Sequence, residues 1–227
     1  MSSLLKNLKP QEQKNIVVIG GGTGTFTVLS GLKKYPNINL SAIVSMADDG
    51  GSTGILREEF GILPPGSVRP ALVALSNSEK MVADLFQFRF TEGNLAGHNL
   101  GNLLLTALVQ RYGNFEKAIE EAGKILQIKG QVIPSTLDQA NLYAKLEDGT
   151  IIHGESNIDV PKHDGNLRIV EIWLDPPCKV NPRAVQAIEK ADLIVIGPGD
   201  LFSSILPNFL VQGLTEAVRE SKAKKVY

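Results

Sequence analysis

The clearest structural signal in the sequence is the segment Ile16-Val17-Val18-Ile19-Gly20-Gly21-Gly22-Thr23-Gly24-Thr25. Its apolar, mostly β-branched residues run directly into three glycines, a pattern typical of a strand buried on both faces. Apolar residues follow at helical spacing, so the glycines form a strand-to-helix turn. Glycine lets the backbone approach a ligand, and amide groups at a helix start attract phosphate. The stretch predicts a phosphate-bearing ligand held by residues 20–25; a turn selected only for tight packing is the alternative.

Known nucleotide-binding motifs fit this turn only in part. The dinucleotide fingerprint needs a glycine where Thr25 stands, and an acidic residue at the end of the second strand, where the chain has Ser45. No Gly-Lys-Ser/Thr follows, so the turn is not a Walker loop. A nicotinamide-dependent oxidoreductase is therefore the least favoured function.

Composition indicates an ordinary globular protein. The 227 residues are 43% hydrophobic with a net charge of -1, which gives no basic excess for binding nucleic acid. The single cysteine, Cys178, cannot form an internal disulfide and fits a reducing compartment. No apolar run approaches the roughly 20 residues that cross a bilayer. We expect a cytoplasmic protein with a flexible N-terminal segment over residues 1–14.

The order of the remaining elements predicts the fold class, α/β. A helix over 25–34 and a second strand over 40–46 give a β-α-β unit, which implies parallel strands. A buried strand over 191–196 lies later in the chain, and one helix is expected over 207–221. We therefore expect a single Rossmann-like domain over 15–227, with three αβα layers and a mainly parallel sheet.

Two further features modify this domain. Short apolar segments flank Glu147-Asp148-Gly149, which is a hairpin signal, so we expect a small antiparallel β insertion over about 129–177. Residues 223–227 resemble the opening of another strand. We expect from this that the chain is truncated at its C-terminus.

A second polar loop, Ala47-Asp48-Asp49-Gly50-Gly51-Ser52-Thr53-Gly54, follows the second strand. Parallel sheets bind ligands beyond the carboxyl ends of their strands, where this loop and the glycine turn both lie. Asp48 and Asp49 could hold a magnesium ion that faces phosphates, accept sugar hydroxyls or take a proton. The alternative is a surface turn with its own hydrogen bonds. Ser52 and Thr53 lie near the cap of a short helix over 55–60.

Three more segments complete the candidate site. Arg69, in a proline-rich turn over 63–70, could bind phosphate or carboxylate, or form a surface salt bridge instead. The glycine-rich segment 93–101 opens an apolar helix. Its polar residues could read a base or sugar or transfer a proton, with helix capping and structural hydrogen bonds as the alternative. These polar residues are His98, Asn99 and Asn102, and the loop after strand 191–196 adds Gly197, Pro198, Gly199, Asp200, Ser203 and Ser204.

Together, the motifs at 20–24, 48–54, 97–102 and 197–208 resemble the YvcK, or gluconeogenesis factor, family. That family belongs to a wider Rossmann-like group with CofD, the 2-phospho-L-lactate transferase of deazaflavin coenzyme synthesis. The resemblance implies a protein that binds UDP-sugars such as UDP-N-acetylglucosamine. It also implies support of peptidoglycan synthesis and cell shape during growth on gluconeogenic carbon sources. The family usually has Asp and Asn where this chain has Ser67 and Pro70, and its members continue past Tyr227.

Two functional hypotheses follow. The first is a regulatory protein that binds a nucleotide sugar without turnover, acts with a cell-wall regulatory protein and forms a homo-oligomer. The second is a magnesium-dependent transferase of a phospho-lactyl-type group, in which Asp48 and Asp49 bind the metal and activate the attacking hydroxyl. The first is favoured because the transferase branch lacks the full Asp-Asp-Gly-Gly-Ser-Thr-Gly pattern, which this chain has.

Overall fold

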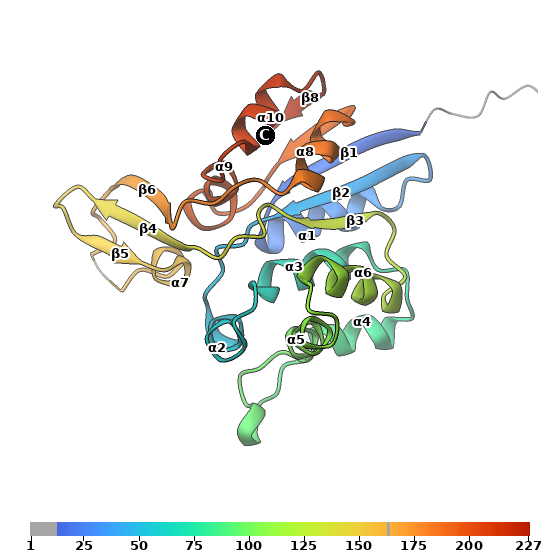
Figure 1. The fold of residues 1–227 in the computed structure, drawn as a ribbon, viewed down its shortest axis with the longest axis horizontal. Coiled ribbons are helices and arrows are strands. Elements are labelled where there is room, and N and C mark those ends of the chain that lie inside the picture. The colour runs from blue at the N-terminus through green and yellow to red at the C-terminus, as the bar shows by residue number, and fades with distance from the viewer. Residues whose placement is uncertain (1–12, 163) are drawn as a thin grey trace, which may run out of the picture.

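The computed structural model describes residues 13–162 and 164–227, whose main body is a parallel sheet between two layers of helices (Figure 1). The strand order is β3-β2-β1-β7-β8, and all four pairings are parallel. Because β1 is the central strand, the glycine turn that follows it begins at the middle of the carboxyl edge of the sheet. The bounds are β1 (Lys14–Gly20), β2 (Ile38–Val44), β3 (Gln131–Pro134), β7 (Leu193–Ile196) and β8 (Lys224–Val226).

Alternate residues of β1 contribute to two apolar cores, one on each face of the sheet. Ile16 and Val18 face the first core, and Val17 and Ile19 face the second. This alternation is what a continuous apolar strand produces when helices cover both faces. The first core is covered by α1 (Gly22–Leu32), α3 (Pro65–Leu75), α4 (Lys80–Gln87), α5 (Leu100–Tyr112) and α6 (Phe115–Ile125), and the second by α8 (Pro182–Glu189) and α10 (Leu214–Glu220).

A small antiparallel sheet lies beside the main body, at the left in Figure 1. Its order is β5-β4-β6, and the short helix α7 follows β5. A third apolar cluster attaches it: Leu142, Ala144 and Ile158 pack with Ala47, which lies in the loop after β2. The small sheet therefore sits next to the polar loops of the main sheet. The bounds are β4 (Asn141–Leu146), β5 (Ile151–His153), α7 (Glu155–Asp159) and β6 (Ile169–Asp175).

The fold class and the hairpin are confirmed, but the insertion begins later than the sequence predicts. Residues 131–134 form β3, which pairs in parallel with β2 at the edge of the main sheet. The insertion therefore starts after Pro134 rather than at about 129. A strand of four residues carries too little periodicity to be identified alone, and only its pairing with β2 reveals it.

Three helices begin earlier than the sequence predicts, and the first of them is α1, which begins at Gly22 rather than at residue 25. The prolines of 63–70 predict a rigid turn, but α3 begins at Pro65. Proline suits the first helical position because its missing N–H would be unpaired there. The helix expected over 55–60 is α2 (Gly51–Phe60), so Ser52 and Thr53 lie in its first turn.

The single helix expected over 207–221 is divided. The chain instead forms a π-helical turn, η3 (Leu201–Ile205), followed by α9 (Leu206–Phe209) and α10. Gly213 has a φ of +94° immediately before α10, a conformation that interrupts a right-handed helix.

Both ends of the chain can be compared with the sequence predictions. The strand expected near the C-terminus is confirmed as β8, which pairs with β7. The flexible segment expected over 1–14 lies outside the described residues except for Gln13 and Lys14, and Lys14 already begins β1. In the described ranges, no helix has the length and apolar character to span a membrane.

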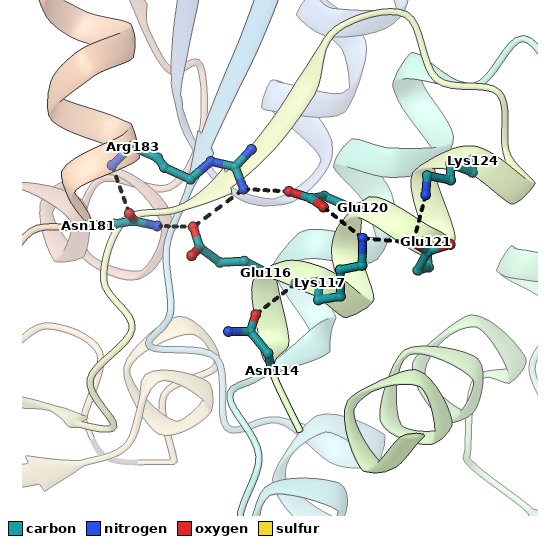
Figure 2. Close-up of polar contacts among 8 residues, drawn as sticks. All are labelled: Asn114, Glu116, Lys117, Glu120, Glu121, Lys124, Asn181 and Arg183. Carbon is teal, nitrogen blue, oxygen red and sulfur yellow. Dashed lines mark hydrogen bonds and ion pairs between the residues drawn. The ribbon is translucent and has the colours of Figure 1, made fainter. Parts of the chain in front are cut away.

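A polar cluster joins the two helical layers around the β3 edge of the sheet (Figure 2). Arg183 of α8 lies 3.0 Å from Glu120 and 3.7 Å from Glu116, both on α6. Asn181, the cap of α8, also donates to Glu116 at 2.9 Å. The cluster places charged side chains beside an edge strand, and charges there disfavour pairing with another chain.

Candidate functional site

A cleft of about 450 Å³ opens at the carboxyl edge of the main sheet. Five parts of the chain line it: the glycine turn after β1, the loop around Asp48, the start of α3, the helix α7, and the loop after β7. The lining residues are Gly21, Gly22, Thr23, Gly24, Asp48, Gly66, Ser67, Glu155, Asp159, Gly199, Asp200, Ser203 and Ser204. Three of the predicted glycine-rich loops, those after β1, β2 and β7, therefore meet at the cleft, and the segment 93–101 does not line it.

The first turn of α1 supplies backbone donors to the cleft. Gly21 is the N-cap in an extended conformation, and among the described residues no side chain caps the helix or places a negative charge in its first turn. The amides at such a helix start and the positive end of the dipole favour an anion. A Cβ on Gly24 would lie 2.1 Å from the Pro198 carbonyl oxygen, so the loop after β7 packs directly on this turn.

Asp48 is held rigidly between α2 and α3. Its Oδ1 accepts a hydrogen bond from the Gly50 N–H at 3.0 Å, and its Oδ2 accepts one from Thr53 Oγ1 at 3.0 Å. A Cβ on Gly66 would come within 1.6 Å of that Oδ2, so only glycine leaves room for the carboxylate. Burial raises the pKa of Asp48, against the opposing effect of these two hydrogen bonds.

Three more carboxylates, those of Glu155, Asp159 and Asp200, line the cleft with Asp48, and we call the four the acidic cluster. Burial, and then the charges of Asp48, Asp159, Asp49 and Asp200, raise the pKa of Glu155 to about 8. Glu155 is therefore mainly protonated at pH 7, where it can donate a hydrogen bond. Protonation also lowers the negative charge that an anionic ligand meets in the cleft.

The two adjacent aspartates have different surroundings. Asp48 lines the cleft, whereas Asp49 Oδ1 accepts hydrogen bonds from the N–H and the Oγ of Ser156, each at 2.9 Å. The magnesium site predicted for the pair would need both carboxylates to face one ion. Across the described residues, no group of three or more His, Cys, Asp and Glu side chains is arranged to hold a metal ion.

A separate polar cluster joins α2, α3 and α5 outside the cleft lining. Ser52 Oγ lies 3.1 Å from His98 Nδ1, and Asn102 Oδ1 accepts a hydrogen bond from Arg69 Nε at 3.0 Å. Asn99 caps α5, because its Oδ1 accepts from the amides of Gly101 and Asn102. His98, Asn99 and Asn102 thus make the capping and structural hydrogen bonds that the sequence left open as the alternative to ligand contacts. Arg69, for which the alternative was a surface salt bridge, is partly buried and donates to a neutral amide oxygen instead.

The structure thus divides the predicted site residues into two sets. The set that lines the cleft is Gly21, Gly22, Thr23, Gly24, Asp48, Gly199, Asp200, Ser203 and Ser204. The set outside the lining is Gly20, Thr25, Asp49, Ser52, Thr53, Arg69, His98, Asn99, Asn102, Gly197 and Pro198. Within the described chain, the buried Thr25 hydroxyl has no hydrogen-bond partner, and it lies beside Gly20.

Sequence reasoning missed four lining residues, Gly66, Ser67, Glu155 and Asp159. The proline pattern places Gly66 and Ser67 in a turn rather than among the first residues of α3. Glu155 and Asp159 belong to the insertion, which nothing in the sequence connects with the site. One signal was available, because the two acids are spaced four apart and so lie on one face of a helix.

Comparisons with known proteins agree on one family. A family model described as 2-phospho-L-lactate transferase CofD matches residues 16–227. The gluconeogenesis factor of Listeria innocua is 50% identical over 225 residues, which cover 98% of this chain and 67% of that protein. The gluconeogenesis factor of Halalkalibacterium halodurans is 49% identical over 218 residues, which cover 95% of this chain and 66% of that protein. A relative from Nostoc sp. is 47% identical over 226 residues, which cover 99% of this chain and 48% of its own.

The fold is also similar to solved structures. A crystal structure of a protein from Bacillus halodurans has a TM-score of 0.89 at 47% identity, covering 95% of this chain and 68% of that one. A second crystal structure from that organism, described as a member of the UPF0052 family, has a TM-score of 0.90 at 46% identity. It covers 96% of this chain and 69% of that one. The chain spans between about half and two thirds of the length of the curated relatives described above.

Proposed function

The chain belongs to the CofD family, and from that premise we propose that it is a regulatory protein that binds a nucleotide sugar of the UDP-N-acetylglucosamine type without turning it over. Its relatives from Listeria innocua and Halalkalibacterium halodurans are named gluconeogenesis factors. The proposal gives this chain a matching role in cell-wall synthesis and cell shape during growth on gluconeogenic carbon sources.

The observation that carries the proposal is that one cleft holds both backbone N–H donors and carboxylate acceptors. The uncapped start of α1 supplies backbone N–H groups for a diphosphate, and the acidic cluster supplies acceptors for sugar hydroxyls. A volume of about 450 Å³ is in the range of small-molecule sites. A nucleotide sugar has both chemical features, an anionic diphosphate and a polyhydroxyl ring.

The protonated state of Glu155 supports this assignment. Four ionised carboxylates would repel a diphosphate, whereas a neutral Glu155 reduces the charge of the acidic cluster and adds a donor. A magnesium ion bound with the diphosphate would lower the repulsion further. Of the two aspartates predicted to hold that ion, Asp48 lines the cleft and Asp49 is engaged with Ser156.

A transferase of a phospho-lactyl-type group is the second candidate, favoured by the description of the matching family model. Such a reaction needs a group that activates the attacking hydroxyl. Asp48 is the candidate because its carboxylate lines the cleft and burial raises its pKa. We rank this function second because Asp49, the other half of the predicted metal pair, lies outside the cleft lining.

The experiment that tests the first proposal is thermal melting with UDP-N-acetylglucosamine, with and without magnesium. Ligand at 100 times its dissociation constant should stabilise the fold by about 2.7 kcal/mol. UDP alone and N-acetylglucosamine alone are the controls, and each should stabilise the fold less than the intact nucleotide sugar. An unchanged melting temperature at millimolar ligand would contradict the proposal. Product formation from a nucleotide-activated phospho-lactyl donor and a deazaflavin acceptor would instead establish the transferase.

The proposal extends to the partners. We propose that the protein forms a homo-oligomer and acts on a cell-wall regulatory protein rather than on nucleic acid, consistent with its net charge of -1. Light scattering across a concentration series measures the oligomeric state, and a mass equal to one chain at every concentration would contradict the first part.

A further inference from the structure

Helix α7 is attached to the main body at both of its ends by polar contacts. Near its start, the N–H and the Oγ of Ser156 donate to Asp49 Oδ1, each at 2.9 Å. At its end, Asp159 Oδ1 lies 2.9 Å from Ser203 Oγ, which belongs to the loop after β7. Two loops from different strands of the main sheet therefore hold one short helix.

Between these contacts, an apolar contact completes the attachment. Ile158 is buried and packs in the cluster with Ala47 and Leu142, and Phe202 of η3 packs against the same cluster. Because α7 has five residues, too few to form a stable helix alone, its position depends on these surroundings. The helix carries Glu155 and Asp159, which are two of the four members of the acidic cluster.

Asp49 holds α7 through its contact with Ser156, and it is the neighbour in sequence of a residue that lines the cleft. One of its carboxylate oxygens accepts two hydrogen bonds, one of them from a backbone amide, and bonds to an ionised acceptor are stronger than neutral ones. Its neighbour Asp48 lines the cleft directly. One aspartate of the pair thus enters the lining, and the other holds the helix that supplies two further carboxylates.

We propose that Asp49 is a positioning residue: through Ser156 it fixes α7 so that Glu155 and Asp159 can contact the ligand. The position of α7 is a property of the free protein, whereas its effect on affinity rests on the proposed binding of a nucleotide sugar. The two parts therefore have separate measurements.

The first measurement is hydrogen exchange of the free protein. Asp49→Ala removes the acceptor, so exchange over residues 154–160 should rise at least tenfold, with the strands of the main sheet unchanged. Asp49→Asn keeps an oxygen in the same place and should restore exchange to within about threefold of the natural chain. Ser156→Ala removes the hydroxyl but not the amide, and should give an intermediate rate.

The second measurement is calorimetric titration with UDP-N-acetylglucosamine. Asp49→Ala should weaken binding at least tenfold and Asp49→Asn by no more than about threefold. Asp138→Ala is the matched control, because Asp138 Oδ2 accepts from the Lys179 N–H at 2.8 Å but lies outside the cleft lining. That variant should bind as the natural chain does.

Each outcome decides one part. Equal exchange over residues 154–160 in Asp49→Ala and the natural chain would overturn the claim that Asp49 fixes α7. Faster exchange without any loss of affinity would overturn the claim that the position of α7 matters for ligand binding. If Asp49→Ala also loses protection in the main sheet, Ser156→Ala takes its place, and the same two comparisons decide. If the natural chain does not bind UDP-N-acetylglucosamine, the proposed function fails, and exchange alone decides whether Asp49 positions α7.

Discussion

Thr53 Oγ1 donates a 3.0 Å hydrogen bond to Asp48 Oδ2, and through it the first turn of α2 fixes the carboxylate that lines the cleft. Thr53 itself is buried and does not line the cleft. Among the polar residues of the loop after β2 and the first turn of α2, Asp48 therefore lines the cleft, and Thr53 holds it in place.

Replacement of Gly66 by alanine should damage the site without removing any polar group. The new Cβ would meet Asp48 Oδ2 at 1.6 Å and Thr53 Oγ1 at 2.4 Å, so the carboxylate must move. We expect at least a tenfold loss of affinity for UDP-N-acetylglucosamine, measured by calorimetric titration.

Gly31→Ala is the matched control for that substitution. Gly31 lies inside α1, and no atom from elsewhere in the fold lies within 4 Å of the position that a Cβ would take. Alanine is therefore expected to stabilise the helix by about 0.5–1 kcal/mol. Its affinity should not change. If Gly66→Ala binds as well as Gly31→Ala does, Asp48 is not fixed in the way that the contacts indicate.

Glu155→Gln should change how stability depends on pH. The pKa of Glu155 is raised from 4.5 to about 8 on folding, so the folded chain holds this proton more tightly than the unfolded chain. The stabilisation of the folded state that this proton provides is fully present below pH 4.5 and is lost as the pH rises to about 8. The slope is at most about 1.4 kcal/mol per pH unit for a single group.

Urea unfolding of both proteins between pH 5 and 9 measures this effect. We expect Glu155→Gln to become more stable relative to the natural chain as the pH rises to about 8. Above that pH, the difference between their free energies of unfolding should stay constant. Parallel curves for the two proteins would show that Glu155 is not buried among the other carboxylates.

Asn102→Ala should lower stability rather than affinity. Asn102 Oδ1 accepts from Arg69 Nε at 3.0 Å, and burial lowers the pKa of Arg69. Removal of the acceptor leaves a partly buried guanidinium without this partner, which costs about 1–3 kcal/mol. A melting curve and a titration with UDP-N-acetylglucosamine separate the two effects. A large loss of affinity at unchanged stability would favour the ligand contact that the sequence predicts.

Asp200→Ala should loosen the loop after β7. Asp200 Oδ1 accepts from the amides of Phe202 and Ser203, each at 2.9 Å, and so caps η3. Loss of a capping side chain costs about 0.5–2 kcal/mol, whereas Asp200→Asn keeps an acceptor and should cost less. Thermal melting ranks the three proteins, and equal melting temperatures for the alanine and asparagine variants would contradict the capping role.

Much of the fold could be predicted because its signals are local. The run Ile16 to Ile19 is apolar throughout, and the glycines after it favour a turn, so the central strand and a helix soon after it follow from the sequence, although α1 begins at Gly22 rather than at residue 25. The short edge strand β3 could not be found in this way, because four residues do not define a period.

The site was predictable in part for the same reason. Loops that follow neighbouring parallel strands meet at one edge, so the sequence placed the glycine turn, Asp48 and the loop after β7 together. Local patterns do not show which way each loop side chain points. Asn99 and Asn102 therefore look available for a ligand in the sequence, and only the fold supplies their partners.

The buried central strand, the glycine turn and the family can be recognised from the chain alone, because each depends on short runs of neighbouring residues. The different roles of Asp48 and Asp49, and the contribution of α7 to the cleft, emerge only in the folded protein. They depend on contacts between residues that are far apart in the chain. Ser156 is 107 residues from Asp49, and packing of the small sheet against the main one is what brings them within 2.9 Å.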